Sequence, residues 1–198
     1  MRRIAIAGLN GSENMLVAKT LAIMCGYELS LSPSFSQTAI RYGLGTDKES
    51  CQWPDSYVYC LGAFTERIIV EQRYGGRFVS DGSVLKELVW LKCRYPHVEL
   101  IYEQSMIRSL ERVLAVYAAK NYDVIFHAEP LPGTDVAGTC LRRLFETYQI
   151  PCRAIDFSNR ENALQVMADR LQAAPKMSVA CSLSKALREL NLTGTVED

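Results

Sequence analysis

The sequence predicts an α/β fold with three layers, in which helices cover both faces of a parallel sheet. Short apolar runs alternate with longer segments of helical periodicity, which is typical of βαβ units. The first apolar run, residues 4–7, has the composition of a buried strand, and a glycine-containing turn joins it to a helical pattern. Right-handed crossovers would bring the carboxyl ends of the strands, and any ligand, to one edge of the sheet.

Periodicity and turn residues locate the individual elements. The predicted strands are residues 3–8, 77–80, 123–127 and 152–156. The predicted helices are residues 13–25, 54–73, 83–94, 103–120, 135–148 and 161–171, with a tail helix at 182–190. The polar, serine-rich stretch 28–53 is expected to be a mobile connection with one short helix near 36–42. In the helix at 54–73, the apolar positions expected to face the core are Tyr57, Leu61, Phe64 and Ile68.

Composition narrows the class of protein. The 198 residues suit one domain, and 22 basic side chains balance 22 acidic ones, so no global field favours nucleic acid or an anionic membrane as a partner. No apolar run reaches transmembrane length and the chain enters a strand at once, which predicts a cytoplasmic protein. The seven cysteines form no C-x-x-C pair, so we expect reduced thiols and no metal site.

The turn after the first predicted strand has part of a phosphate-binding sequence. A working loop has the form G-x-x-x-x-G-K-[ST], in which backbone amides cradle phosphates, the lysine reaches the outer phosphates and the hydroxyl binds Mg²⁺. Here the first glycine is present, but Glu13 replaces the second glycine, Asn14 the lysine and Met15 the hydroxyl residue. The predicted phosphate- or nucleotide-binding residues are Gly8, Asn10, Gly11, Ser12, Glu13, Asn14 and Met15.

With its elements in this order, the chain resembles the P-loop nucleoside and nucleotide kinases, near the nicotinamide riboside kinases, with a degenerate Walker A loop. The resemblance covers residues 2–173 and implies the P-loop kinase fold. Besides the loop and the A-K-x-L sequence at residues 18–21, three motifs carry it. They are Phe78-Val79-Ser80-Asp81-Gly82-Ser83, similar to F-x-S-D-R-S; Tyr122-Asp123-Val124-Ile125-Phe126, similar to the strand before the lid; and Gln149-Ile150-Pro151, similar to a G-I-P entry.

The resemblance also implies roles outside the loop. In such kinases the aspartate at the strand end acts on the acceptor hydroxyl or the metal shell, and the arginine after it contacts substrate or phosphate. Asp81 is therefore the candidate catalytic residue, whereas Gly82 replaces the arginine. Asp81 has a second interpretation, as a cap of the next helix through the Ser83 amide. The candidate anion contacts are Arg41, Arg142 and Arg143. For the two arginines of the lid region, 131–143, a solvated helix face is the competing interpretation.

The loop substitutions predict weak phosphate binding. If Glu13 pointed at a phosphate about 4 Å away, the two charges would repel by about 4 kcal/mol, which is roughly a thousandfold in affinity. Ser12 suits a helix N-cap and Glu13 suits the positive end of a helix dipole, so the chain is expected to fill the anion site with its own side chains. A competing interpretation is a hairpin turn at Asn10-Gly11, without any phosphate site.

Other polar residues have weaker claims to a site. His127 ends a predicted strand near Asp81, where it is either a core residue or a base. Arginines 67, 73 and 77 alternate with acidic residues along the chain, which favours a salt-bridged helix surface over a nucleic-acid patch.

Two functions stay open for a domain at 1–174. The first is a kinase-fold protein with impaired or lost phosphoryl transfer, which acts as a binding or regulatory protein and has no certain cofactor. The alternative is an active nucleoside or nucleotide kinase that binds ATP and Mg²⁺ in an unusual way, although Lys19 lies more than a helical turn beyond the lost lysine. The tail, 175–198, has one amphipathic helix that packs either on its own domain or on a second copy or protein partner.

Overall fold

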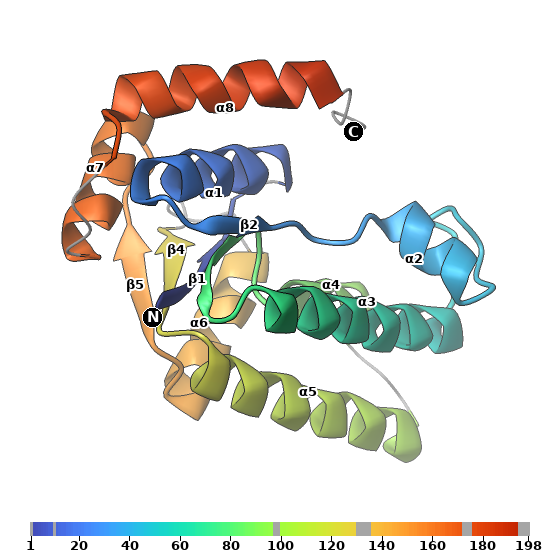
Figure 1. The fold of residues 1–198 in the computed structure, drawn as a ribbon. Helices are drawn as coiled ribbons and strands as arrows, with labels where there is room; N and C mark the ends of the chain where they lie inside the picture. Colours follow the sequence, from blue (N-terminus) through green and yellow to red (C-terminus); the bar gives the residue numbers. More distant parts are fainter. Residues whose placement is uncertain (1, 10, 97–99, 130–135, 172–175, 194–198) are drawn as a thin grey trace.

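A parallel sheet forms the centre of the molecule. The computed structural model describes residues 2–9, 11–96, 100–129, 136–171 and 176–193. In these ranges, five parallel strands are arranged in the order β2-β3-β1-β4-β5 (Figure 1). The strands are β1 (Arg2–Ala7), β2 (Glu28–Ser30), β3 (Arg77–Ser80), β4 (Val124–Ala128) and β5 (Cys152–Ile155).

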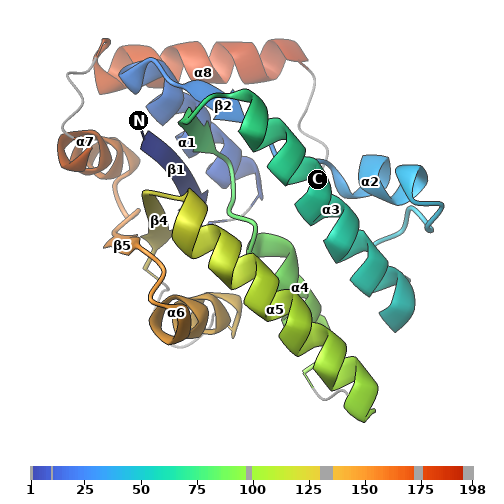
Figure 2. The ribbon, with the colours of Figure 1, turned by 60° about the horizontal axis from the view of Figure 1, so that its bottom comes forward.

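Helices cover both faces of the sheet. They are α1 (Gly11–Cys25), α2 (Phe35–Arg41), α3 (Trp53–Arg73), α4 (Lys86–Arg94), α5 (Ile101–Asn121), α6 (Val136–Tyr148), α7 (Arg160–Arg170) and α8 (Val179–Thr193). Figures 1 and 2 show α1 and α7 on one face and α3 to α6 on the other, with α8 outside α1 and α2 projecting from the body. This arrangement confirms the predicted α/β fold.

The alternation of side chains in β1 separates two cores. Ile4 and Ile6 pack with residues of α1 and α7, whereas Ala5 and Ala7 belong to the core formed with α3 to α6. Successive residues of a strand point to opposite faces, so a strand that is covered on both faces must be apolar at nearly every position. This explains why the first strand could be recognised from its continuous apolar run.

The structure corrects two predictions about elements. The stretch 28–53 contains the strand β2 as well as the predicted short helix. In α3 the buried residues are Ser56, Tyr59, Cys60, Gly62, Ala63, Arg67 and Glu71. The most buried face is therefore rotated by one residue from the predicted face, on which Leu61 is 39% exposed. Apolar periodicity failed here because α3 buries Arg67 and Glu71, whose polar partners lie on other elements.

The tail helix α8 packs on its own domain. Leu16 on α1 clusters with Ala186 and Leu190 on α8, and Lys19 of α1 forms an ion pair with Glu189 of α8 (3.2 Å between Nζ and Oε2). Of the two packing arrangements left open by the sequence, the structure has the contact within the chain.

Candidate kinase-like site

The β1–α1 loop, residues 8–10, is shorter than the expected phosphate loop. β1 ends at Ala7 and α1 already begins at Gly11, so the hairpin interpretation is wrong. Gly8 adopts φ +85°, and a Cβ atom at this position would lie 3.2 Å from the backbone nitrogen of Ala128. Glycine is therefore required for the conformation and for the close approach to β4. Asn10 lies outside the described residues.

Asn14 binds the loop back onto itself. Its Oδ1 accepts a hydrogen bond from the amide of Leu9 (3.3 Å), and its Nδ2 donates to the carbonyl of Leu9 (3.2 Å). The Asn14 side chain is buried. The Asn14 side chain thus satisfies both polar groups of Leu9 in the loop.

The other substituted positions contact helices that pack beside α1. Glu13 forms an ion pair with Arg160 of α7, with 3.1 Å between Oε1 and Nη2. Met15 packs against the cluster of apolar residues between α1 and α8. Ser12 is exposed and is the second residue of α1, so the expectation that it is the N-cap is wrong. These contacts give Glu13 and Met15 structural roles in this fold.

Asp81 belongs to a buried polar cluster on the neighbouring strand. We define the Asp81 cluster as Ser32, Arg67, Ser80, Asp81 and Gly82. Asp81 Oδ1 accepts hydrogen bonds from the amide (2.6 Å) and the hydroxyl (2.5 Å) of Ser32, which follows β2. Among the described residues, the carboxylate makes no hydrogen bond to the next helix, whose N-cap residue is Leu85. The interpretation of Asp81 as a helix cap is therefore wrong.

The guanidinium of Arg67 joins this cluster from α3. Its Nη1 donates to the hydroxyl of Ser80 (2.7 Å) and the carbonyl of Gly82 (3.1 Å), and lies 3.7 Å from Asp81 Oδ1. Its Nη2 donates to the hydroxyl of Ser32. Arg67 is only 1% exposed, so the prediction of a salt-bridged surface is wrong for this arginine.

Three buried carboxylates surround the charge of Arg67. Burial by itself would lower the pKa of Arg67, but Glu87, Asp81 and Glu71 outweigh it and raise that pKa. Glu71 accepts hydrogen bonds from the hydroxyls of Tyr122 (2.8 Å) and Tyr117 (3.2 Å). Burial raises the pKa of Glu71, although Arg67 and the two tyrosines oppose the shift. The cluster is thus a fixed electrostatic unit whose cation is enclosed by protein.

The structure separates the remaining predicted residues from this cluster. Arg41 is exposed on α2 and pairs with Glu66 (2.8 Å), while Arg142 and Arg143 are exposed on α6. These two arginines therefore lie on a solvated helix face. Because β1 lies between β3 and β4, Asp81 and His127 are separated by two strand spacings, roughly 10 Å. The expectation that they are neighbours is wrong; His127 packs edge-on against Phe145 instead.

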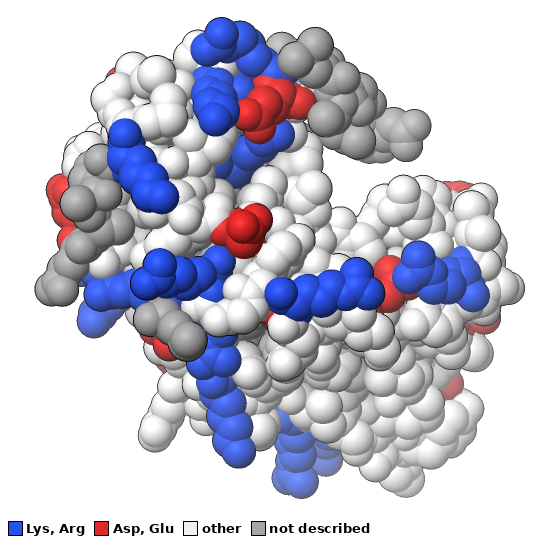
Figure 3. All heavy atoms as spheres, in the orientation of Figure 1, with Lys and Arg blue, Asp and Glu red and all other residues white. Residues whose placement is uncertain are grey.

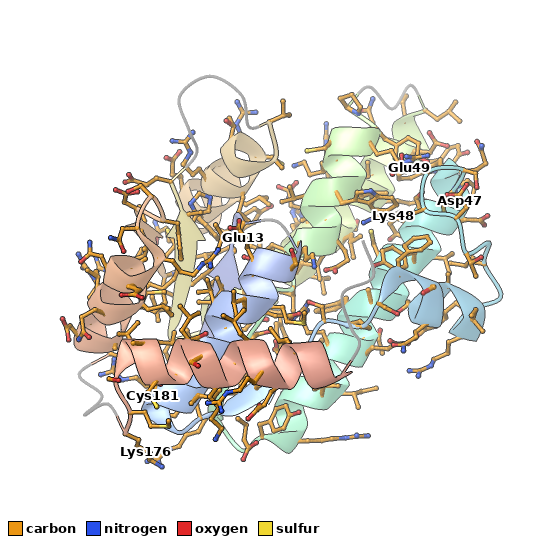
Figure 4. The ribbon with its side chains drawn as sticks, turned by 90° about the horizontal axis from the view of Figure 1, so that it is seen from above. Glu13, Asp47, Lys48, Glu49, Lys176 and Cys181 are labelled. Atoms are coloured by element: carbon orange, nitrogen blue, oxygen red, sulfur yellow. The ribbon has the colours of Figure 1, made fainter. Side chains whose placement is uncertain are left out.

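Across from α1, a lobe formed by α2 to α4 presents aromatic side chains. Figure 4 shows Lys48 on this lobe and Glu13 at the start of α1. Lys48 Nζ lies 5.0 Å from the ring centroid of Trp90 and 5.9 Å from that of Phe35. Burial lowers the pKa of Lys48, while the Glu87 carboxylate opposes that shift. A cation therefore lies over two aromatic rings on this lobe.

The rest of the described surface offers fewer candidate binding sites. A cavity of about 360 Å³, lined in part by Arg3, Phe78 and Tyr117, lies at the amino ends of the strands, opposite to the edge where such sheets bind ligands. Figure 3 shows basic and acidic side chains interspersed on one face. Within the described ranges, no three His, Cys, Asp or Glu residues could together hold a metal ion, and no helix is long and apolar enough to span a membrane.

Sequence reasoning missed Arg67 and Ser32 as site residues. A signal for Arg67 was present, because Cys60, Ala63, Arg67 and Glu71 recur with helical spacing on one face of α3. No such signal exists for Ser32, since its partner Asp81 lies 49 residues further along the chain.

Comparison with known proteins supports the fold. No protein-family model matches the chain, and no curated protein matches its sequence. A solved structure of deoxyadenosine kinase from M. mycoides with bound dCTP is 14% identical, with a TM-score of 0.56, over 86% of this chain and 98% of that chain. A sugar kinase from a Janibacter species, without ligand, is 12% identical over 90% of this chain and 98% of that one, but its TM-score of 0.37 supports no conclusion. The first likeness shows that this chain has a P-loop-kinase-like fold.

Proposed function

We propose that this kinase-fold protein has impaired or lost phosphoryl transfer and acts as a binding or regulatory protein. The observation that carries the proposal is the contact of Asn14 with both polar groups of the Leu9 peptide. Phosphoryl transfer depends on fixed positive charge and backbone donors around the transferring group. A neutral side chain stands where the fold would place a lysine, and it occupies one of those donors.

Lys19 does not supply the missing charge. Lys19 is engaged with Glu189 of α8, and it lies more than a helical turn along α1 from Asn14. Glu13 adds a carboxylate in the first turn of the helix, where a phosphate would otherwise benefit from the helix dipole. Together these residues disfavour bound triphosphate.

A second function is favoured by two specific observations. Asp81 is held rigidly at the strand end, and Arg160 brings a guanidinium to the start of α1 through its ion pair with Glu13. An active nucleoside or nucleotide kinase would use Arg160 in place of the lysine. In that case ATP with Mg²⁺ must displace Glu13 from Arg160.

Calorimetric titration with ATP and Mg²⁺, followed by a turnover assay, tests the proposal. Deoxyadenosine is the first acceptor to use, because the structurally similar enzyme is named for it. We expect no turnover and an ATP dissociation constant above about 1 mM, which corresponds to a binding free energy weaker than about 4 kcal/mol. Turnover that is lost in Arg160→Ala would replace this proposal with the active-kinase alternative.

A variant that restores the loop residues provides the matched test. Glu13→Gly, Asn14→Lys and Met15→Ser together remove one negative charge and add one positive charge beside the phosphate position. We expect ATP affinity to rise by at least about tenfold, or about 1.4 kcal/mol. Unchanged affinity in a folded triple variant would show that the substitutions do not limit nucleotide binding.

A further inference from the structure

We propose that residues 43–52, which we call the strap, form a cover on the lobe of α2 to α4 that opens when the amine of Lys48 is acylated. The strap joins α2 to α3, and Figure 4 labels three of its residues, Asp47, Lys48 and Glu49. The inference goes beyond the proposed function, because it requires neither a nucleotide nor the β1–α1 loop.

The middle of the strap is attached to the body by side chains. All of its residues lie in the described part of the chain, and none belongs to a helix or a strand. Its backbone–backbone hydrogen bonds to other described segments involve only its ends, at Gly43, Leu44 and Gln52. A segment that few backbone hydrogen bonds attach can open without unfolding of the domain. Residues 45–51 therefore depend on side-chain contacts to stay closed.

The carboxyl-terminal part of the strap is held by two residues at the end of α4. The Tyr95 hydroxyl donates to the carbonyl of Cys51 (2.9 Å). Arg94 Nη2 donates to the carbonyls of Glu49 and Cys51, and Arg94 Nη1 lies 3.5 Å from Glu49 Oε2. The peptide that follows Glu49 is thus engaged by α4 while the strap is closed.

Lys48 holds the middle of the strap through its charge. Its Nζ lies over the rings of Trp90 (5.0 Å to the centroid) and Phe35 (5.9 Å). Lys19 and Lys92 pair with carboxylates, whereas Lys48 forms no ion pair with a described residue. The attraction between an ammonium and the face of an aromatic ring therefore attaches this residue to α4 and α2.

The amino-terminal end of the strap can act as a hinge. Gly43 adopts φ +70°, and a Cβ atom at Gly43 or at Gly45 would meet nothing within 4 Å. Two glycines in open space let the backbone rotate without a steric clash. The strap can therefore move away from α4 once its contacts to that helix are broken.

Acylation removes the charge on which the Lys48 contact depends. Burial lowers the pKa of Lys48, while the Glu87 carboxylate opposes the shift, so the nucleophilic neutral amine is more populated than in a solvated lysine. The side chain is only partly buried, so a reagent can reach it. Its nitrogen attacks the carbonyl carbon of an acyl thioester: a C–N bond forms, the C–S bond breaks, and the proton lost by nitrogen goes to the departing thiolate. The amide product is uncharged and has no cation–π attraction.

Opening changes the surface that the lobe presents. The rings beneath Lys48, Phe35 and Trp90, pack against Tyr59 and against each other. Movement of the strap uncovers these rings. Acylation of one lysine thereby converts a covered aromatic surface into an exposed one.

The first experiment tests whether Lys48 is an acylation site. The full chain is treated with the acetyl thioester of N-acetylcysteamine, and then with hydroxylamine to cleave any thioester formed on cysteine. Mass spectrometry of peptides then gives the acetylation rate of each lysine. Lys48 should react faster than Lys120, which is exposed on α5. Acetylation of Lys48 that is equal to or slower than that of Lys120 would overturn the proposal.

The second experiment measures opening by limited proteolysis with a glutamate-specific protease. Cleavage after Glu49 requires release of its carbonyl from Arg94, so the cleavage rate reports the population of the open strap. Lys48→Gln, which is neutral like an acylated lysine, should speed this cleavage about fivefold. Lys48→Arg keeps a cation over the rings, and Lys120→Gln removes a charge elsewhere, so both should cleave at the wild-type rate.

The acetylated proteins connect the two experiments. Acetylated wild type should be cleaved after Glu49 as fast as Lys48→Gln, whereas acetylated Lys48→Arg should stay at the slow rate. A wild-type cleavage rate in Lys48→Gln, or equal acceleration in Lys48→Arg, would show that the charge of Lys48 does not hold the strap, and the proposal would fail. These outcomes leave the proposed function untouched, because ATP binding and turnover report on the β1–α1 loop.

Discussion

The β1–α1 loop and the Asp81 cluster lie on neighbouring strands, yet their polar groups are satisfied in different ways. In the loop, the Asn14 carboxamide binds the Leu9 peptide, so the chain takes up a donor that a ligand would need. In the cluster, Arg67 and Ser32 hold only Asp81 Oδ1. The difference teaches that in one region the chain satisfies both polar groups of a loop peptide with its own side chain, whereas in the other the hydrogen bonds from Ser32 go to only one oxygen of the carboxylate.

The variant with the largest expected effect tests whether the stability of the Asp81 cluster depends on the buried cation of Arg67. Arg67→Met would leave the carboxylates of Asp81, Glu71 and Glu87 buried without their counter-charge. We expect a loss of about 3–5 kcal/mol in the free energy of unfolding, measured by urea denaturation. Arg73→Met, at an exposed position of the same helix, should change stability by less than about 0.5 kcal/mol. Equal effects would show that the cluster is not held by Arg67.

The next test concerns the backbone of the β1–α1 loop. Gly8→Ala places a side chain at φ +85° and 3.2 Å from the Ala128 nitrogen. We expect a loss of about 1–3 kcal/mol, again from urea denaturation. Gly45→Ala is the control, since a Cβ atom there meets nothing within 4 Å. If Gly8→Ala left the free energy of unfolding unchanged, the β1–α1 loop would be free to adopt another conformation. The description of this loop as closed would then be wrong.

A smaller effect is expected from the side chain that closes the loop. Asn14→Ala removes both hydrogen bonds to the Leu9 peptide. The expected loss in unfolding free energy is about 1–2 kcal/mol, and amide exchange of Leu9 should become faster. Asn162→Ala, on the exposed face of α7, is the control. Unaltered exchange at Leu9 would show that Asn14 does not protect this amide.

The smallest effect concerns pH and Glu71. Burial raises the pKa of Glu71 above its ordinary value of 4.5, so the folded state favours the protonated carboxyl. Its contribution to stability is complete below that ordinary value and is lost as pH rises through the folded-state pKa. Glu71→Gln stays neutral, so the wild type should lose stability relative to this variant as pH rises above 4.5 through the raised pKa of Glu71. Urea denaturation across this range measures the difference, and a constant difference would contradict the assigned shift.

Much of the fold was predictable because each element has its own local signal. Ile4 and Ile6 lie in a continuous apolar run, and Val17, Leu21 and Met24 of α1 recur with helical spacing and are all buried. By contrast β2 has only three residues and pairs only with β3, so it leaves no periodic pattern in the sequence. Its existence follows from pairing with a strand almost fifty residues away.

The candidate site was less predictable, for the same physical reason. Asp81 and residues 13–15 of the loop were predicted as site residues because they occupy motif positions, and their role in a site stays a prediction. The prediction that Arg67 lies on a salt-bridged surface was wrong, because the alternation of charges along a chain does not reveal which charged side chains a helix buries. The partners of Arg67 come from two separate segments, one at Ser32 and the other at Ser80 and Gly82.

The sequence by itself determined four of the five described strands, the order of the helices and the glycine at residue 8. Only the tertiary structure decided that Asn14 closes the loop, that α8 covers α1 and that Arg67 holds Asp81. Local patterns are set by neighbours along the chain, whereas hydrogen bonds and ion pairs between distant segments form only when the packed layers bring those segments together.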